Sequence, residues 1–269
     1  MTTIQWYPGH IAKAKRKLLE FLKLTDIVIY VLDSRLPFGT RLTEIEDRLR
    51  QKKIILLLNK SDLSDPKKNQ LWINYFSKKY PKVFLFEALD NKGIKEIFKS
   101  ISFIRNQIVK NSITKDIRLM VVGVPNCGKS SLINRLSCRK ATKVGALAGV
   151  TRSHQWIMLE NGIYILDQPG IFFPKIDSHD QAWKLAVIGS IKLEVLPIEE
   201  IALKLVDYLM KHDYIKSDDP LNFITDNAKK SGFFVGNENA PDIIKSSLNI
   251  IKRFQDGKFG RITLEEPVI

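Results

Sequence analysis

Residues 123–131 read Gly-Val-Pro-Asn-Cys-Gly-Lys-Ser-Ser, and this stretch decides how the rest of the chain is interpreted. It fits the pattern G-x-x-x-x-G-K-[ST], a loop whose backbone N–H groups surround a phosphate. The preceding residues, 117–122, form an apolar run that predicts a buried strand, and residues 132–136 have helical spacing. This order of strand, loop and helix predicts a phosphate site, because the start of the helix adds partial positive charge.

Individual residues of this loop have expected roles toward a bound nucleotide. Lys129 would reach the β- and γ-phosphates, and the Ser130 hydroxyl would ligate Mg²⁺. The other loop residues expected to touch the nucleotide are Asn126, Cys127, Gly128 and Ser131. A glycine-rich turn that binds nothing is the competing interpretation, and the motif alone does not exclude it.

Positive charge is concentrated in the first two thirds of the 269-residue chain, whose formal net charge is +14. Residues 1–180 hold 31 Lys and Arg against 16 Asp and Glu, whereas residues 181–269 hold 12 against 13. This distribution favours a polyanionic partner such as RNA. A lysine-rich solvated surface without a partner would have the same charge, and composition does not separate the two.

Composition also indicates the cellular setting. The chain is 44% hydrophobic, enough for a sizeable core, and it has two cysteines, Cys127 and Cys138. A disulfide at Cys127 would distort the phosphate loop, so the sequence indicates a reducing compartment. The apolar stretches are strand-length and none resembles a signal peptide. We therefore expect a soluble cytoplasmic protein with no membrane partner, and a monomer.

Apolar strands alternate with helices along residues 1–178. Strands that are apolar on both sides predict a parallel sheet between two helix layers, a three-layer α/β domain. The expected strands are 26–32, 54–58, 83–86, 117–122, 154–159 and 162–166, and the expected helices are 11–24, 41–50, 66–80, 93–109 and 132–136. Residues 5–10 are interpreted as an aromatic turn and residues 137–150 as a mobile loop.

The pattern changes beyond residue 178. Amphipathic helices are expected at 182–191, 198–211 and 243–254, separated by loops around 218–220 and 236–237. The sequence therefore predicts a small all-helical C-terminal domain over residues 179–269.

The sequence Asn59-Lys60-Ser61-Asp62 follows a buried strand and indicates which base is bound. Guanine presents two adjacent donors, N1–H and the exocyclic amine, that the Asp62 carboxylate would accept together. Adenine lacks this donor pair and would leave the carboxylate unpaired, a loss of roughly 2–4 kcal/mol. Asn59 would contact the far edge of the base, and the stem of Lys60 would lie along the base and ribose. A turn that only caps the strand is the competing interpretation.

A further contact to guanine is expected after the strand at 83–86. Ala88 is the candidate, because its N–H would meet guanine O6. GTPases more often have Ser before that Ala, and Glu87 stands there instead.

Two short motifs downstream of the phosphate loop have the pattern of nucleotide-dependent switches. Asp167-Gln168-Pro169-Gly170 matches D-x-x-G, in which Asp167 would hold a Mg²⁺-bound water and the Gly170 N–H would bond the γ-phosphate. Thr151 would supply a hydroxyl to Mg²⁺ and its N–H to the γ-phosphate. Each motif alone is a weak signal.

The order of these motifs is unusual, because the base-reading residues precede the phosphate loop. In ordinary GTPases the phosphate loop comes first, and joining the old ends while opening the chain elsewhere would produce the order found here. The chain thus looks like a circularly permuted GTPase, and it closely resembles the ribosome biogenesis GTPase A family. The resemblance covers nearly the whole chain. It rests on Tyr7–His10 with the basic helix after it, Asp33–Pro37, Asn59–Asp62, Gly123–Ser131, Gly149–Thr151 and Asp167–Gly170.

The resemblance implies an assembly factor that hydrolyses GTP and binds the maturing large ribosomal subunit, with the C-terminal domain contacting rRNA. The expected partners are thus GTP or GDP, the large subunit and its rRNA. Hydrolysis is expected to be slow for the protein alone and stimulated by the subunit. The near-neutral charge of residues 181–269 fits this rRNA role poorly.

Ile171 stands where a glutamine often follows D-x-x-G, so catalysis needs another group or proceeds slowly. The resemblance makes His10 the candidate catalytic residue, since a neutral imidazole would position water; a structural histidine is the alternative. In a subset of similar GTPases an Asn at the position of Asn126 helps to hold K⁺, which makes K⁺ a second candidate cation. A polar loop residue that bonds its own backbone is equally compatible.

Two other functions remain open at this point. One is a GTPase that acts on another RNA. The other is a GTP- or GDP-dependent binding module with negligible turnover, which Ile171 favours.

Overall fold

The computed structural model describes residues 8–87, 93–109, 116–137, 142–143, 155–160, 162–167, 178–191, 193, 197–236 and 239–267. The chain divides into two compact units, one of Met1–Lys175 together with Glu265–Ile269, and one of Ile176–Leu264. The expected boundary after residue 178 differs from this division by three residues. The expected C-terminal domain, 179–269, also included the last five residues, which group with the first unit.

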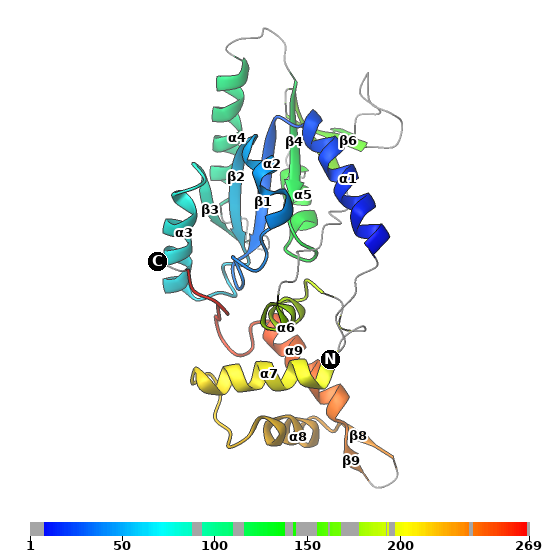
Figure 1. Cartoon of the computed structure of the whole chain (residues 1–269). Coiled ribbons are helices and arrows are strands. Elements are labelled where there is room, and N and C mark those ends of the chain that lie inside the picture. Colours follow the sequence, from blue (N-terminus) through cyan, green and yellow to red (C-terminus); the bar gives the residue numbers. More distant parts are fainter. Residues whose placement is uncertain are drawn as a thin grey trace. The chain divides into compact units, whose positions relative to one another are not determined.

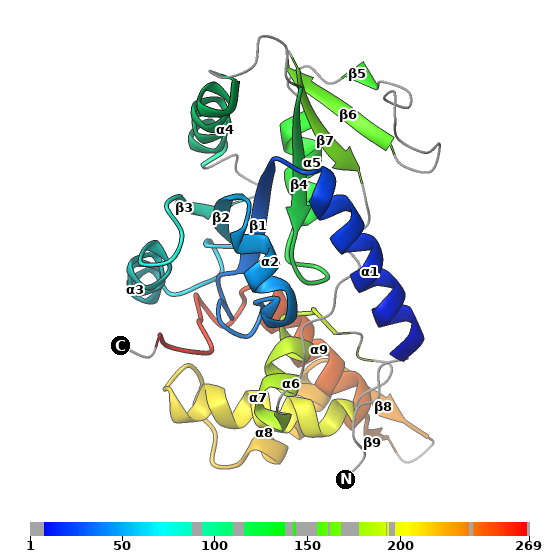
Figure 2. The same ribbon diagram turned by 45° about the horizontal axis from the view of Figure 1, so that its top comes forward.

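Within the described residues, the first unit contains a seven-stranded sheet in the order β3-β2-β1-β4-β7-β6-β5 (Figures 1 and 2). Neighbours among β1, β2, β3, β4 and β7 pair in parallel, whereas β6 is antiparallel to both β7 and β5. The strands are β1 Ile27–Asp33, β2 Lys53–Asn59, β3 Val83–Phe86, β4 Ile117–Val122, β5 Thr142–Lys143, β6 Gln155–Glu160 and β7 Ile163–Asp167.

Helices cover both faces of this sheet, which confirms the predicted three-layer architecture. Helices α2 and α3 lie on one face together with α1, and α4 and α5 lie on the other (Figures 1 and 2). Every residue of β1 is buried because the strand is central and covered on both sides. The helices are α1 Pro8–Leu24, α2 Glu46–Arg50 after the 3₁₀ turn η1 Thr43–Ile45, α3 Pro66–Ser77, α4 Ile94–Val109 and α5 Lys129–Ser137.

Two local expectations for the first unit are corrected. Helix α1 begins at Pro8, so His10 belongs to its first turn and not to the predicted aromatic turn; Pro is well suited to a first helical turn. Residues Thr142–Lys143, expected within a mobile loop, form the edge strand β5, paired with Ile157 and Met158 of β6. The rest of that predicted loop from residue 138 lies outside the described residues.

The second unit is built mainly from helices, which are α6 His179–Val187, α7 Ile198–Lys211, α8 Pro220–Lys230 and α9 Ile243–Gln255. Helix α8 was not predicted, since only a loop around residues 218–220 was expected there. Asp219 and Pro220 form its start: the Asp219 carboxylate accepts from the N–H groups of Leu221 and Asn222. A short hairpin, β8 Phe234–Val235 with β9 Ala240–Pro241, corrects the expectation that this part is all-helical.

Apolar faces of these helices form the core of the second unit. Its fully buried side chains include Leu205, Ile224 and Ile250, one from each of α7, α8 and α9. No helix in the described part of the chain is long and apolar enough to cross a membrane.

Candidate functional site

The loop after β4 approaches neighbouring groups too closely for any residue but glycine at two positions. A Cβ on Gly123 would lie 2.3 Å from the carbonyl oxygen of Val31 in β1. Gly128 has φ +99°, and a Cβ there would lie 2.0 Å from Nδ2 of Asn59. The loop is therefore packed tightly against the ends of β1 and β2, and it leads directly into α5.

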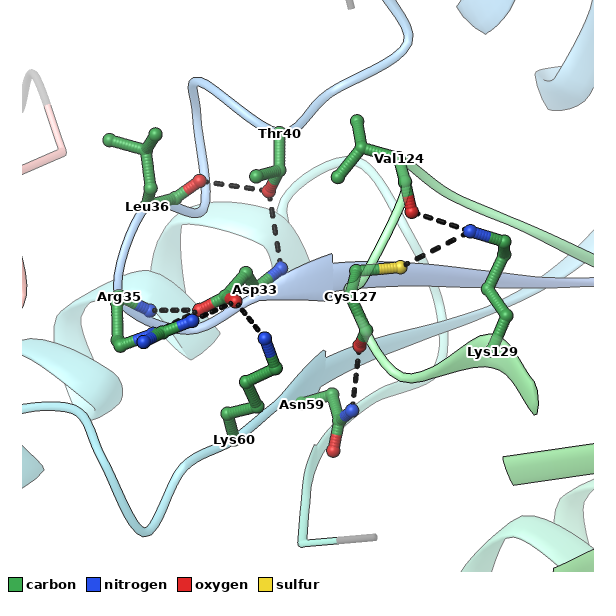
Figure 3. A network of polar contacts seen from close by, with 9 residues as sticks. All are labelled: Asp33, Arg35, Leu36, Thr40, Asn59, Lys60, Val124, Cys127 and Lys129. Carbon is green, nitrogen blue, oxygen red and sulfur yellow. Dashed lines mark hydrogen bonds and ion pairs between the residues drawn. The ribbon is translucent and has the colours of Figure 1, made fainter. Parts of the chain in front are cut away.

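The side chain of Lys129 is buried inside this loop. Its Nζ donates to the carbonyl of Val124 and lies 4.0 Å from the Cys127 sulfur (Figure 3). Burial lowers the pKa of Lys129, and the nearby charge of Lys60 lowers it further. Burial also raises the pKa of the Cys127 thiol. A phosphate beside Lys129 would supply the negative charge that favours its ammonium form.

Asn59 joins the predicted base-reading loop to the phosphate loop. Its Nδ2 donates to the carbonyl oxygen of Cys127 at 2.7 Å (Figure 3). Its Oδ1 is buried and has no hydrogen-bond partner within the described chain. An unsatisfied buried acceptor is costly, and a donor from a bound ligand would satisfy it.

Lys60 is held by an aspartate that sequence reasoning did not assign to the site. Its Nζ lies 2.9 Å from Oδ2 of Asp33, the residue opposite Asn59 in the β1–β2 register (Figure 3). Lys60 has φ +61°, a left-handed conformation that is strained for a side chain of this size. The ion pair thus fixes the direction of Lys60 from a buried position at the end of β1.

Asp33 is fully buried and has a second cationic partner, Arg35. The Arg35 guanidinium donates to both carboxylate oxygens, at 3.0 Å from Nε and 2.8 Å from Nη2. Burial alone would raise the pKa of Asp33, but Arg35 and then Lys60 outweigh it and hold that pKa well below its usual range. Thr40 completes the turn: its hydroxyl accepts from the Asp33 N–H at 3.2 Å and donates to Leu36 at 2.8 Å.

The sequence signal for this network was present but not used. Asp33 and Arg35 are charged residues two positions apart at the end of a wholly apolar strand. Such a pair is rarely buried unless its members bind each other. Both residues belong to a motif that carries the family resemblance, but the contact of Asp33 with Lys60 depends on strand pairing, which local sequence does not show.

Asp62, the predicted guanine reader, lies in the turn after β2 with its side chain exposed. Neighbouring Ser61 is buried, and its hydroxyl donates to Oε1 of Glu87 at 3.0 Å. Glu87 stands where GTPases more often have Ser, and this contact gives it a structural role, because it joins the turn after β2 to the end of β3. Ala88, the expected guanine O6 donor, lies outside the described residues.

The predicted Mg²⁺ ligands are only partly described. Ser130 is exposed in the first turn of α5. Asp167 is the last residue of β7. Because Ile165 pairs with Leu119 of the parallel strand β4, the backbone of Asp167 lies beside the last residues of β4, just before the phosphate loop. Hydroxyl and carboxylate oxygens are the hard ligands that Mg²⁺ prefers, so this donor set fits the ion.

Several predicted residues have no described surroundings. Thr151 and Gly170 lie outside the described residues. The backbone of His10 is in α1 and that of Asp167 in β7, but the surroundings of their side chains are not described. The loop residues Asn126 and Ser131 are exposed, and Asn126 has φ +57°.

The turn after Arg35 is also bound by the end of the chain, which the sequence did not indicate. The Glu265 carboxylate accepts from the backbone N–H of Phe38 and, at 3.1 Å, from that of Gly39. Glu266 lies 2.9 Å from Nζ of Lys68 in α3. These contacts explain why the last residues belong to the first unit.

Comparisons with known proteins agree with this architecture. A family model described as 50S ribosome-binding GTPase matches residues 118–238. Ribosome biogenesis GTPase A of Priestia megaterium is 34% identical over 280 residues, which cover 98% of this chain and 97% of that protein. The GDP-bound structure of TM YlqF has a TM-score of 0.75 at 31% identity, covering 94% of this chain and 99% of that one. For GNP-bound YlqF from T. maritima the TM-score is 0.73 at 30% identity, with coverage of 95% and 98%.

The buried charge network makes a testable prediction about stability. Asp33→Asn should lower the free energy of unfolding at pH 7 by about 3–5 kcal/mol, because Arg35 and Lys60 lose their counter-charge. Because the folded-state pKa of Asp33 is depressed, its contribution is present above the unfolded pKa of about 3.9 and is lost as the pH falls below it. When the pH is lowered from about 4 to about 2, the free energy of unfolding should therefore fall less for Asp33→Asn than for the wild type.

Urea unfolding followed by circular dichroism at pH 7 and at lower pH measures both effects. Asp47→Asn is the control, because the Asp47 side chain is 90% exposed. Equal stability of Asp33→Asn and the wild type at pH 7 would contradict a structural role for this ion pair.

Proposed function

The chain belongs to the ribosome biogenesis GTPase A family, and we propose that it is an assembly factor for the large ribosomal subunit that binds rRNA and changes its affinity with the bound nucleotide. The observation that carries the proposal is the contact between Asn59 and the Cys127 carbonyl, which brings a base-reading loop to a phosphate loop. The family model's description, 50S ribosome-binding GTPase, supports the large subunit as the partner. We propose that the protein works as a cytoplasmic monomer.

For the nucleotide itself we propose guanosine di- and triphosphate, as in the GDP- and GNP-bound relatives. Lys129 and the loop N–H groups bind the β- and γ-phosphates, while Asp62 accepts from guanine N1–H and the exocyclic amine. Asn59 and Lys60 contact the base, and Lys60 is directed by Asp33. Ala88 and Gly170 complete the contacts at guanine O6 and at the γ-phosphate. The loop residues Asn126, Cys127, Gly128 and Ser131 line the phosphates.

GTPases of this kind generally use Mg²⁺, and we propose Ser130, Thr151 and Asp167 as the residues that hold it, Asp167 through a water. The ion, when bound, neutralises charge that develops on the phosphate oxygens. Ser130 and Asp167 are supported by their positions at the start of α5 and the end of β7, on adjacent strand–loop segments.

Hydrolysis needs a group that orients water, because Ile171 cannot hydrogen-bond. We propose that His10 does so as a neutral imidazole. Turnover is then slow for the protein alone and faster on the large subunit, where binding would hold the start of α1 in one position. Asn126 would help to hold K⁺ beside the phosphates, where a cation offsets the charge of the transition state.

The central prediction is that affinity for the large subunit follows the nucleotide. Sucrose-gradient sedimentation with a non-hydrolysable GTP analogue should move the protein with large subunits, whereas GDP should leave it at the top of the gradient. Small subunits in the same experiment are the control. Co-sedimentation with small subunits alone would instead support a GTPase that acts on another RNA.

Asp62→Ala should weaken GDP binding by roughly 100-fold, because two hydrogen bonds to a charged acceptor are lost. Titration with labelled GDP measures this, and competition with ATP shows whether discrimination between the bases falls as well. Asp47→Ala, at an exposed carboxylate away from both loops, should bind GDP as the wild type does. Equal competition by ATP and GTP in the wild type would contradict the guanine assignment.

His10→Ala should keep its affinity for GTP and lose turnover, by roughly 10²–10⁴-fold if the imidazole positions water. Phosphate release should be measured with and without large subunits, since a stimulated rate is the sensitive one. Unchanged turnover under both conditions assigns His10 a structural role. Negligible wild-type turnover under both conditions would favour a nucleotide-dependent binding module.

Turnover in K⁺ buffer should exceed turnover in Na⁺ buffer if Asn126 helps to hold a K⁺ ion. Asn126→Ala should remove the difference between the two salts while leaving GDP affinity within a fewfold of the wild type. Equal rates in K⁺ and Na⁺ would remove this role from the proposal.

A further inference from the structure

The beginnings of β2 and β3 border a groove of about 480 Å³ on the surface of the first unit, which we call the amino-edge groove. Residues from the end of α2, the end of α3 and the middle of α4 complete its walls. The residues used in the argument are Arg50, Lys52, Lys53, Lys79, Lys82 and Phe103.

The charge of the amino-edge groove is almost uncompensated. Arg50 is paired with Asp47 at 2.8 Å, but in the described part of the chain no ion pair joins any of the four lysines to a carboxylate. No acidic residue lines the groove. Lysines gathered without counter-charges repel one another, and a bound polyanion would remove this cost.

An aromatic ring is exposed among these lysines. The Phe103 side chain on α4 is 54% exposed, and Nζ of Lys82 lies 5.3 Å from the centre of its ring. A base that stacks on the ring would place its own phosphates near the lysines, an arrangement that proteins use for single-stranded nucleic acid. An acidic protein surface would form ion pairs with the lysines, but it would not explain the exposed aromatic ring of Phe103 as well as a stacked base does.

A second basic groove adjoins the first. It lies between α1 and α2, and Lys52 lines both grooves. Arg16, Lys23 and Arg48 add positive charge to it, against a single lining carboxylate, Glu20, which is 4.0 Å from Arg16. Because the two grooves share Lys52, the basic residues of one continue into those of the other.

We propose that the amino-edge groove binds an unpaired segment of RNA, with a base stacked on Phe103 and the backbone along the lysines. The inference rests on the proposed function, which supplies rRNA as the partner, and adds the face that holds it. This face is separate from the nucleotide. Lys53 begins β2 and Asn59 ends it, so strand β2 separates groove and nucleotide site by about 20 Å.

The first test removes charge from the groove without touching the nucleotide site. Lys53→Gln with Lys82→Gln should weaken binding of a fluorescent unpaired RNA of about 12 nucleotides more than tenfold in 0.1 M salt. Two lost phosphate contacts should also reduce the slope of log K against log salt by about 1.4. Binding to large subunits should weaken in parallel, and GDP affinity should not change.

The matched control makes the same charge change at the other ends of these strands, where β2 and β3 lead into α3 and α4. Lys67→Gln with Lys95→Gln alters exposed lysines at the starts of α3 and α4. This variant should bind RNA within twofold of the wild type. An equal loss in both double variants would mean that only total charge matters, and would overturn the assignment to the groove.

The second test concerns stacking. Phe103→Ala should weaken binding of unpaired RNA at least fivefold with no change in the salt slope. Leu71→Ala, at an apolar side chain 44% exposed on α3, should have no effect. An unchanged affinity of Phe103→Ala, or an equal loss on a fully paired duplex, would overturn the proposal of an unpaired segment.

The proposal and the function on which it rests fail differently. If the wild type binds large subunits and the Lys53/Lys82 variant binds them equally, the groove proposal is wrong and the proposed function stands. If the variant loses large-subunit binding but binds free RNA as the wild type does, the groove contacts a ribosomal protein and the RNA proposal is wrong. A wild type that binds neither RNA nor large subunits overturns both.

Discussion

The candidate site depends on one close approach, between the side chain of Asn59 and the backbone of the phosphate loop. The amide donates to the Cys127 carbonyl at 2.7 Å, and the space beside it leaves no room for a Cβ on Gly128. A larger residue at either position would push the two loops apart. Because one loop would bind the base and the other the phosphates, their separation must match the length of a nucleotide. The contact of Asn59 with Cys127 thus holds the loop after β2 and the phosphate loop at a fixed distance from each other.

The buried carboxylate of Asp33 helps to fix the loop that contains Asn59 and Lys60. Asp33 is shared between Arg35 and Lys60, so the direction of Lys60 and the course of the turn after β1 are set by the same charge. Two cations around one aspartate leave a net positive charge in a buried place, which favours anionic ligands nearby. The Glu265 carboxylate holds the backbone N–H groups of Phe38 and Gly39 a few residues further on. The turn therefore has little freedom to move independently of the site.

Local patterns in the sequence were sufficient for six strands of the first unit and for most helices, because these depend on periodicity and burial. They were not sufficient for the two-residue strands β5, β8 and β9. The segments 27–33 and 53–59 are short and almost wholly apolar, a pattern that predicts strands buried at the centre of a sheet. Helix α8 was missed because Asp218-Asp219-Pro220 was interpreted as a loop and not as the start of a helix. The contact of Asp33 with Lys60 and those of Glu265 with Phe38 and Gly39 were missed for a different reason. These contacts join segments far apart in the chain, and strand pairing or chain path decides them, not local sequence.

The order of the strands explains why the unusual order of motifs has no consequence for the geometry. From β1 the chain moves outward through β2 to β3. It then returns to β4 beside β1, crosses to the other edge at β5, and comes back through β6 to β7. Helices α2 and α3 therefore cover one face and α4 and α5 the other (Figures 1 and 2). The direction of the connections changes between β1 and β4, the kind of position at which open α/β sheets bind ligands. Asp33 and the phosphate loop flank this point whichever strand comes first in the chain. The amino edge, where β2 and β3 begin, is at the other end of these strands from the residues expected to bind the nucleotide. Uncompensated lysines and an exposed Phe103 at that edge are therefore better explained by a second ligand than by the nucleotide.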